Sequence, residues 1–348
     1  MITDLTRQKL AELTDYVEGV TSTGRWLVLM HDNPDPDSIA AAAGLSKLLR
    51  KVFKRRVTTA YGGIIGRAEN QQMVKVLGIR LSHLRYLNWK HYRHFALVDT
   101  QPRTGNNQLP EALTPDLVFD HHPPRRATQQ SPFVDLRPEY GATATILAEY
   151  LMAADLEISK RDATAFVYAI RTETQDFGRQ YARADKAVYD GLHSSADLRA
   201  LAKIQAPPLP ESYYRTLHEA LEHVESVETL VVSHVGKVAQ PDIVPEIADL
   251  LLRLRGKTWS FSTGVFEDRL YLSIRTTNPR ADAGRLMRRL LGKRGKGGGH
   301  GMMAGGWITL PKNGGGDQQR LQASLTTRLA QYLKKIRELM APLILDEI

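Results

Sequence analysis

The sequence predicts an α/β protein: a mostly parallel N-terminal sheet flanked by helices, a helical linker and a smaller C-terminal α/β domain. Short apolar runs alternate with segments of helical periodicity, which is typical of a parallel sheet. Several of these runs end directly on acidic or histidine residues. A Pro-rich break precedes a second mixed pattern, so we expect domains at 1–190 and 225–348 and the linker at 191–224.

The elements of the first half follow from apolar runs for strands and from helical spacing of apolar residues for helices. The predicted strands are 26–30, 57–61, 95–98 and 117–119, and the predicted helices are 3–20, 39–49, 67–77, 142–153, 163–170 and 183–204. The segment QAPPLPE, 205–211, interrupts the helical pattern and gives the domain break.

The second half shows the same two signals beyond the break. The predicted helices are 211–223, 243–254, 280–291 and 318–339, and the predicted strands are 230–232, 259–266, 270–275 and 307–310. The stretch KGGGHGMMAGG, 296–306, is interpreted as a glycine-rich loop. Its glycines let backbone amides approach an anion closely, although a merely flexible loop has the same composition.

Composition limits the classes of function. The 348 residues are 42% hydrophobic, contain no cysteine and carry a net charge of +9, which favours anionic partners. Without cysteine any metal must be held by His, Asp and Glu, and a reducing cytoplasm is the expected location. The start of the chain carries Asp4 and Glu12, and no apolar run approaches the roughly 20 residues of a membrane span, so we expect a soluble protein without a membrane partner.

The loop HDNPDPDS, 31–38, follows the first predicted strand and concentrates potential metal ligands. His31, Asp35 and Asp37 lie within seven residues. Carboxylate oxygens and imidazole nitrogens together suit a divalent ion such as manganese. An ordinary turn with a helix cap from Asp37 or Ser38 explains the loop equally well when it is considered alone.

Two further predicted strands end in the same chemistry. One run ends on Asp99, and the next ends on Asp120-His121-His122. Because parallel strands bring their carboxyl ends to one edge of the sheet, these groups and the 31–38 loop are expected to converge. Crowded carboxylates repel one another, and metal ions relieve that repulsion. Two ions about 3.5–4 Å apart are a recurrent device for phosphoester hydrolysis.

The motifs HDNPDPD at 31–37, LVDT at 97–100, DHH at 120–122 and GGGH at 297–300 together resemble the DHH superfamily of phosphoesterases with its DHH-associated C-terminal domain. The resemblance covers roughly residues 25–310. It is nearest to the oligoribonuclease and pAp-phosphatase branch, which is related to the RecJ exonuclease core. It implies a metal-dependent hydrolase.

The resemblance further implies two divalent ions, manganese first, with magnesium and cobalt as alternatives. His31 and Asp35 would hold one ion, and Asp37 and His121 the other, with Asp99 bridging. The family's Thr-Asp-Thr motif is Thr-Glu-Thr here, so Glu173 takes the ligand position and Asp176 is the alternative. The implied metal ligands are His31, Asp35, Asp37, Asp99, His121 and Glu173.

The same resemblance implies residues for catalysis and for substrate binding. The catalytic set comprises Asp99, Asp120, His121 and His122, with Asp120 and His122 supporting the ligands or facing the substrate. Residues of the C-terminal domain would grip a phosphate of the substrate. This substrate-binding set comprises Arg275, Gly298, Gly299 and His300.

The expected activity is hydrolysis of short oligonucleotides, or of 3'-phosphoadenosine 5'-phosphate (pAp), by a hydroxide held between two metal ions in the cleft between the domains. A phosphodiesterase for cyclic or linear dinucleotides and a non-catalytic nucleotide-binding protein are the alternatives. Exopolyphosphatase-type members are expected to share only the N-terminal half. The sequence leaves open a homodimer.

Overall fold

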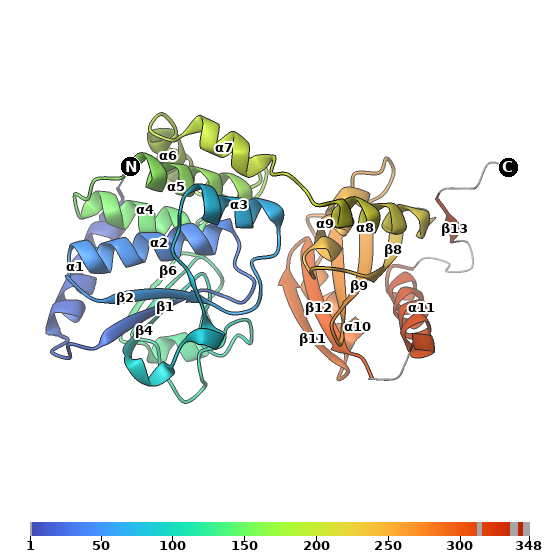
Figure 1. Cartoon of the computed structure of the whole chain (residues 1–348), viewed down its shortest axis with the longest axis horizontal. Helices are drawn as coiled ribbons and strands as arrows, with labels where there is room; N and C mark the ends of the chain where they lie inside the picture. Colours follow the sequence, from blue (N-terminus) through green and yellow to red (C-terminus); the bar gives the residue numbers. More distant parts are fainter. Residues whose placement is uncertain (1, 312–314, 335–339, 344–348) are drawn as a thin grey trace. The chain divides into compact units, whose positions relative to one another are not determined.

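The computed structural model describes residues 2–311, 315–334 and 340–343, and for His300 and residues 315–317 the backbone only. The chain forms two compact units, Met1–Pro207 and Pro208–Ile348, which divide inside the Pro-rich segment (Figure 1). They are called the first and the second unit here. None of the helices in the described part of the chain is long and apolar enough to cross a membrane.

The first unit is built on a six-stranded sheet in which every pairing is parallel, in the order β3-β2-β1-β4-β5-β6. Its strands are β1 (Arg25–Leu29), β2 (Val57–Tyr61), β3 (Ser82–His83), β4 (Tyr92–Val98), β5 (Leu117–Asp120) and β6 (Phe133–Leu136). Its helices are α1 (Asp4–Gly19), α2 (Pro36–Lys51), α3 (Ala68–Val76), α4 (Thr143–Ala153), α5 (Lys160–Glu173), α6 (Arg183–His193) and α7 (Leu198–Gln205). The predicted fold class is therefore confirmed for this half.

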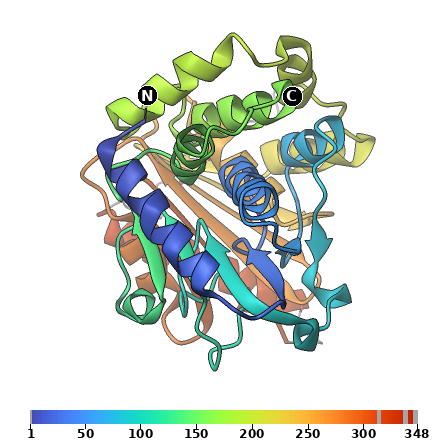
Figure 2. The same ribbon diagram turned by 90° about the vertical axis from the view of Figure 1, so that its left-hand side faces the viewer.

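The two faces of this sheet are covered differently. Side chains from α1, α2, α4 and α5 pack on one face in the larger core; α2, α4 and α5 lie above the strands in Figure 1, and α1 crosses in front of the sheet in Figure 2. The short 3-10 turns η1 (Leu84–Tyr86) and η2 (Trp89–His91) and the loop after β4 contribute to a smaller core on the other face. A third such turn, η3 (Arg126–Gln130), precedes β6. Because β1 is covered on both sides, it is apolar from Trp26 to Leu29 rather than alternating.

Two predictions for this unit need correction. The single helix predicted over 183–204 is two helices, because Ser194 ends α6 and Asp197 begins α7 by accepting hydrogen bonds from the amides of Arg199 and Ala200. The two edge strands, β3 of two residues and β6 of four, were also not predicted. Both strands are too short to show a clear period.

The second unit contains a seven-stranded mixed sheet in the order β11-β12-β10-β9-β8-β7-β13, with β8 and β9 parallel. Its strands are β7 (Val224–Val227), β8 (Leu230–Lys237), β9 (Trp259–Phe266), β10 (Arg269–Thr276), β11 (Gly295–His300), β12 (Met303–Thr309) and β13 (Ala341–Pro342). Its helices are α8 (Glu211–Glu222), α9 (Ile243–Leu251), α10 (Ala283–Leu291) and α11 (Gly315–Tyr332). Helices α10 and α11 contribute to one core, and α8 and α9 to another. The end of the helix predicted over 318–339 lies outside the described residues.

The glycine-rich stretch was predicted as a loop, and this is wrong for residues 295–300. They form the edge strand β11, paired antiparallel with β12. The reason is the close approach of α10. A Cβ atom on Gly284 of α10 would lie 1.9 Å from the carbonyl oxygen of Gly299, and one on Gly297 would lie 2.5 Å from Leu291. Here the glycines allow a helix to pack directly on a strand.

The predicted helical linker over 191–224 is divided between the two units. Helix α7 packs against α3 and α5 of the first unit, whereas α8 packs on β8 of the second. The described residues of this segment therefore belong to one core or the other, apart from the Pro-rich stretch between α7 and α8.

Candidate metal centre

The strand order places the predicted ligands at one point of the first sheet. The direction in which consecutive strands are added reverses between β1 and β4, and the carboxyl ends beside such a reversal form the usual binding crevice of open α/β sheets. His31 follows β1, Asp99 follows β4 and His121 follows β5. This topology agrees with the prediction that these strand ends converge.

The distances show how closely the groups approach. His31 Nε2 lies 3.7 Å from Asp35 Oδ1 and 3.5 Å from Asp99 Oδ2. His121 Nε2 lies 3.6 Å from Asp99 Oδ1 and 3.9 Å from Asp37 Oδ2. These separations exceed hydrogen-bond length, but atoms that each bind one ion at about 2.0–2.2 Å lie about 3–4 Å apart. Asp99 is common to both sets of contacts, as a bridging ligand would be.

The tautomers of the two histidines support a metal site. His31 Nδ1 lies 2.9 Å from the carbonyl oxygen of Asp32, and His121 Nδ1 lies 3.1 Å from that of Tyr140. A carbonyl only accepts, so each Nδ1 carries a proton and each neutral ring has a lone pair on Nε2. His121 Nε2 is buried and has no hydrogen-bond partner among the described residues. A lone pair aimed at carboxylates is unfavourable unless a proton or a metal ion lies between them.

Helix α4 holds two of the carboxylates. Asp37 accepts hydrogen bonds from the backbone amides of Thr143 (2.8 Å) and Ala144 (2.7 Å), in the first turn of the helix. The hydroxyl of Thr143 donates to Asp99 Oδ1 over 2.9 Å. No side chain at the N-cap, Ala142, caps this helix, so Asp37 takes that role from another helix. The positive end of α4 thereby stabilises the carboxylates.

Crowding of negative charge is visible in the pKa values. Burial, reinforced by Asp99 and Glu173, raises the pKa of Asp37. Burial, reinforced by Asp35 and Asp99, raises the pKa of Glu173 to about 7. Burial disfavours the charged ring of His121, but Asp99 and Glu173 outweigh it and raise its pKa as well. The side chains present therefore fit a cation-binding centre.

His122 has a different environment from His121. Its Nδ1 donates to Asp120 Oδ1 over 2.8 Å, and Gln101 donates to the other oxygen of Asp120 over 2.7 Å. The side chain of His122 is 37% exposed, against 12% for His121. Although His122 Nδ1 is 3.7 Å from Asp99, using it as a ligand would break the bond to Asp120. This placement suits a group that faces the substrate.

Glu173 and Asp176, the two candidates for the last ligand, lie in different surroundings. Glu173 ends α5, is partly buried and interacts electrostatically with Asp35 and Asp99. Asp176 is 69% exposed and pairs with Arg171 at 2.5 Å. The placement favours Glu173 as the metal ligand.

Arg275 of the predicted substrate-binding set is held within the second unit. Its Nε pairs with Asp249 of α9 at 2.6 Å, and its Nη1 donates to Ser273 (2.9 Å) and to backbone carbonyls. The guanidinium therefore contributes to packing of α9 on the sheet, and its role toward substrate stays a prediction. Gly298 and Gly299 lie on the edge strand β11, which His300 ends. A Cβ on Gly298 would meet no atom within 4 Å, so the strand is open at this point.

Sequence reasoning missed several groups that hold the centre in place. Gln101 receives hydrogen bonds from the amide of Arg125 and the hydroxyl of Thr128 while it donates to Asp120. Its position two residues after Asp99, at the end of a strand, was a usable signal. Thr143 and the carbonyl of Tyr140 give no such signal, because their roles depend on contacts between distant segments.

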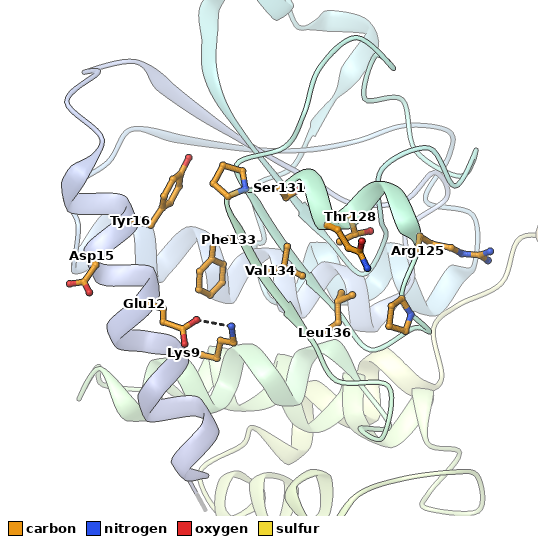
Figure 3. Close-up of a pocket in the computed structure, with 13 residues that line it drawn as sticks. Lys9, Glu12, Asp15, Tyr16, Arg125, Thr128, Ser131, Phe133, Val134 and Leu136 are labelled. Carbon is orange, nitrogen blue, oxygen red and sulfur yellow. Dashed lines mark hydrogen bonds and ion pairs between the residues drawn. The ribbon is translucent and has the colours of Figure 1, made fainter.

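A cavity of about 670 Å³ lies elsewhere in the first unit, between α1 and β6 (Figure 3). Lys9 and Glu12 of α1 form an ion pair of 2.6 Å at one side, and Phe133 lies opposite. None of its lining residues belongs to the predicted site. The cavity therefore gives no support to any predicted role.

A parallel sheet whose strand ends gather imidazoles and carboxylates offers the ligand types that divalent cations prefer. The model of the DHH family N-terminal domain matches residues 25–170, and that of the DHHA1 domain matches residues 228–340. The chain belongs to the DHH superfamily of phosphoesterases, as predicted.

Three known proteins resemble this chain to different extents. The uncharacterized protein MJ1633 of Methanocaldococcus jannaschii is 35% identical over 286 residues, which cover 82% of this chain but only 58% of that protein. A crystal structure of an exopolyphosphatase-related protein from Bacteroides fragilis has a TM-score of 0.72 at 16% identity, covering 94% of this chain and 96% of that one. RecJ from Thermus thermophilus, in complex with Mn2+, has a TM-score of 0.55 at 13% identity, covering 96% and 55%.

The solved structures show likeness of fold alone. The expectation that exopolyphosphatase-type members share only the N-terminal half is wrong for the Bacteroides fragilis protein, whose match spans both units. Differences in the C-terminal domain therefore do not separate this chain from a protein of that name.

Proposed function

We propose that this protein is a phosphoesterase that uses two divalent ions, manganese first, to hydrolyse short oligonucleotides or pAp. The observation that carries the proposal is the pair of histidines whose Nδ1 protons are bonded to backbone carbonyls while Nε2 faces shared carboxylates. His31, Asp35 and Asp99 would hold one ion, and Asp99, Asp37 and His121 the other, completed by Glu173. Bound ions would lower the pKa of water and neutralise charge on the phosphoryl oxygens.

Protein groups would orient the substrate at this centre. The hydrogen bond from His122 Nδ1 to Asp120 fixes the ring, so Nε2 is the nitrogen that would donate to a phosphoryl oxygen. Burial disfavours the charged ring, but Asp120 and Asp99 outweigh it and raise its pKa, which favours the protonated form. A charged donor binds a phosphate oxygen more strongly than a neutral one.

An exposed cationic surface on the second unit supports an oligonucleotide substrate. Residues 280–296 contain seven Lys or Arg residues and one acid, Asp282. The seven exposed cations are Arg280, Arg285, Arg288, Arg289, Lys293, Arg294 and Lys296. Arg288 and Arg289 also complement the dipole at the end of α10, but the cations outside the helix have no such role. Clustered cations suit the successive phosphates of a nucleic acid.

A direct test combines metal titration with a substrate series. We expect calorimetry to show two manganese ions per chain, and metal-loaded protein to release mononucleotide from two- to five-residue RNA, or phosphate from pAp. A cyclic dinucleotide tests the alternative phosphodiesterase. Activity that survives excess chelator would contradict the proposal, and manganese binding without turnover of any of these substrates would favour the non-catalytic alternative.

The identity of the last ligand gives a second expected result. We expect Glu173→Gln to weaken manganese affinity at least about 10-fold, because it removes a charge next to Asp35 and Asp99. Asp176→Asn should change the affinity less than about 2-fold, because its carboxylate is exposed and paired with Arg171. Calorimetry at limiting manganese measures both variants. If only Asp176→Asn weakens binding, Asp176 is the ligand.

The cytoplasmic location and a homodimer stay predictions. The absence of cysteine from the sequence fits the former, and size-exclusion chromatography with light scattering would test the latter.

A further inference from the structure

Asp185 is a fully buried acid outside the four sequence motifs and beyond residue 170, where the match to the DHH N-terminal domain ends. It lies in the first turn of α6. Its Oδ2 accepts from the backbone amides of Gly141 and Ala182, each at 2.7 Å, and its Oδ1 accepts from the hydroxyl of Thr145 at 2.6 Å. All three donors are neutral groups.

Two of these three donors belong to the start of α4. Gly141 immediately precedes the N-cap, and Thr145 is in the first turn of the helix. The amides of Thr143 and Ala144, between them in sequence, hold Asp37, and the Thr143 hydroxyl holds Asp99. The buried carboxylate of Asp185 is therefore hydrogen-bonded to the same turn of α4 that donates hydrogen bonds to Asp37 and Asp99, two proposed metal ligands.

We propose that Asp185 is a positioning residue for the metal centre. It fixes the first turn of α4, and this turn orients Asp37 and Asp99 toward the ions. The inference rests on the proposed function in that these carboxylates are the ligands. Groups that orient metal ligands in this way typically affect metal affinity by about 10–100-fold.

A purely local role explains only part of the geometry. The bond from the Ala182 amide to Asp185 is an ordinary contact between a helix N-cap and the third residue of the helix. The bonds to Gly141 and Thr145 join residues that are 44 and 40 positions apart in the sequence. The start of α6 is already capped by the local bond. The bonds to Gly141 and Thr145 stabilise the start of α4.

The backbone at Gly141 is closely packed against other segments of the first unit. A Cβ atom on Gly141 would lie 2.6 Å from Thr174 Cγ2 and 3.0 Å from the carbonyl oxygen of Gln180. The start of α4 thus runs closely past the end of α5, next to Glu173. This turn contacts α2 through Asp37, the end of α5 through Thr174, and α6 through Asp185. Asp185 supplies the hydrogen bonds that connect the turn to α6.

The chemistry predicts which substitution is tolerated. In Asp185→Asn the side-chain oxygen can still accept from Gly141 and Ala182, and the new NH2 group can donate to Thr145, whose hydroxyl also accepts. In Asp185→Ala the donors of Gly141 and Thr145 lose their partner. We therefore expect Asn to retain the positioning and Ala to lose it.

The experiment compares manganese affinity and hydrogen exchange in the whole 348-residue chain. We expect Asp185→Ala to weaken manganese binding about 10–100-fold and to speed amide exchange in residues 141–147, whereas Asp185→Asn stays within about 3-fold of wild type in affinity. Exchange is measured without metal, so it reports on the turn independently of the proposed function. Thr145→Val removes one of the three bonds at constant side-chain shape, and it should give an intermediate loss of affinity. This variant provides the test if Asp185→Ala does not fold.

Asp162→Ala is the matched control. Asp162 also accepts hydrogen bonds at the start of a helix, from the amide and hydroxyl of Ser159, and pairs with Lys47, but it contacts none of the proposed ligands. It should lower stability and leave manganese affinity unchanged. Wild-type affinity in both Asp185→Ala and Thr145→Val, or an equal loss in Asp162→Ala, would overturn the inference. Failure of the wild type to bind manganese would instead overturn the proposed function, and the inference with it.

Discussion

Asp99→Asn is expected to lower kcat by at least about 10³-fold, equivalent to about 4 kcal/mol, and to abolish binding of the second manganese ion. Asp99 is the residue that both candidate metal groups share. The loss should exceed the roughly 10–100-fold effect typical of residues that only orient ligands. Asn is preferable to Ala because Asp99 has a φ of +57°, a left-handed conformation that Asn tolerates better than other residues with a side chain.

Asp116→Asn is the control for a general effect of removing an acid from this sheet. Asp116 lies just before β5, at the opposite end of the strands, and accepts from the Phe95 amide (2.8 Å) and the Tyr16 hydroxyl (2.8 Å). This variant should lose stability and keep two manganese ions and most of its activity. Calorimetry, steady-state kinetics and thermal melting measure both variants. Asp99→Asn with more than a tenth of wild-type kcat would contradict the shared-ligand role.

The sequence was informative where chemistry and local pattern coincide. An apolar run that ends on His31, Asp99 or Asp120 predicts both a buried strand and the edge at which its last residues lie. Given a parallel sheet, convergence of these groups follows without knowledge of any loop. For this reason the fold class and the approach of His31, Asp99 and His121 could be predicted.

The contacts that orient these groups could not be predicted, because each joins segments far apart in the chain. The amides that hold Asp37 come from residues 106 and 107 positions later, and Asp185 contacts Thr145 of α4 from 40 positions away. The glycine run was misjudged for the same reason. Nothing local distinguishes a loop from an edge strand on which a helix packs, as α10 does on β11.

Arg137→Met is expected to lower the free energy of unfolding of the first unit by about 3–5 kcal/mol, the range for removing one partner of a buried ion pair. The Arg137 side chain is completely buried. It forms a two-pronged pair with Asp135, at 2.9 and 2.7 Å, and a further bond of 2.8 Å to Glu149, which is also completely buried. Removing the guanidinium leaves the buried carboxylates of Asp135 and Glu149 without the cation that pairs with both of them. For a unit of this size the loss corresponds to a fall of roughly 10 °C in Tm.

A triple variant separates uncompensated charge from lost packing. Arg137→Met combined with Asp135→Asn and Glu149→Gln removes all three charges and preserves most of the volume. If stranded charge dominates, this variant should recover much of the stability that the single variant loses, because replacing a buried ion pair as a whole is often nearly neutral. If it is no more stable than Arg137→Met, the lost packing and hydrogen bonds of the guanidinium are responsible. Lys160→Met, which removes an exposed pair with Asp197 at 3.5 Å, should change Tm little, because exposed pairs contribute at most about 1 kcal/mol.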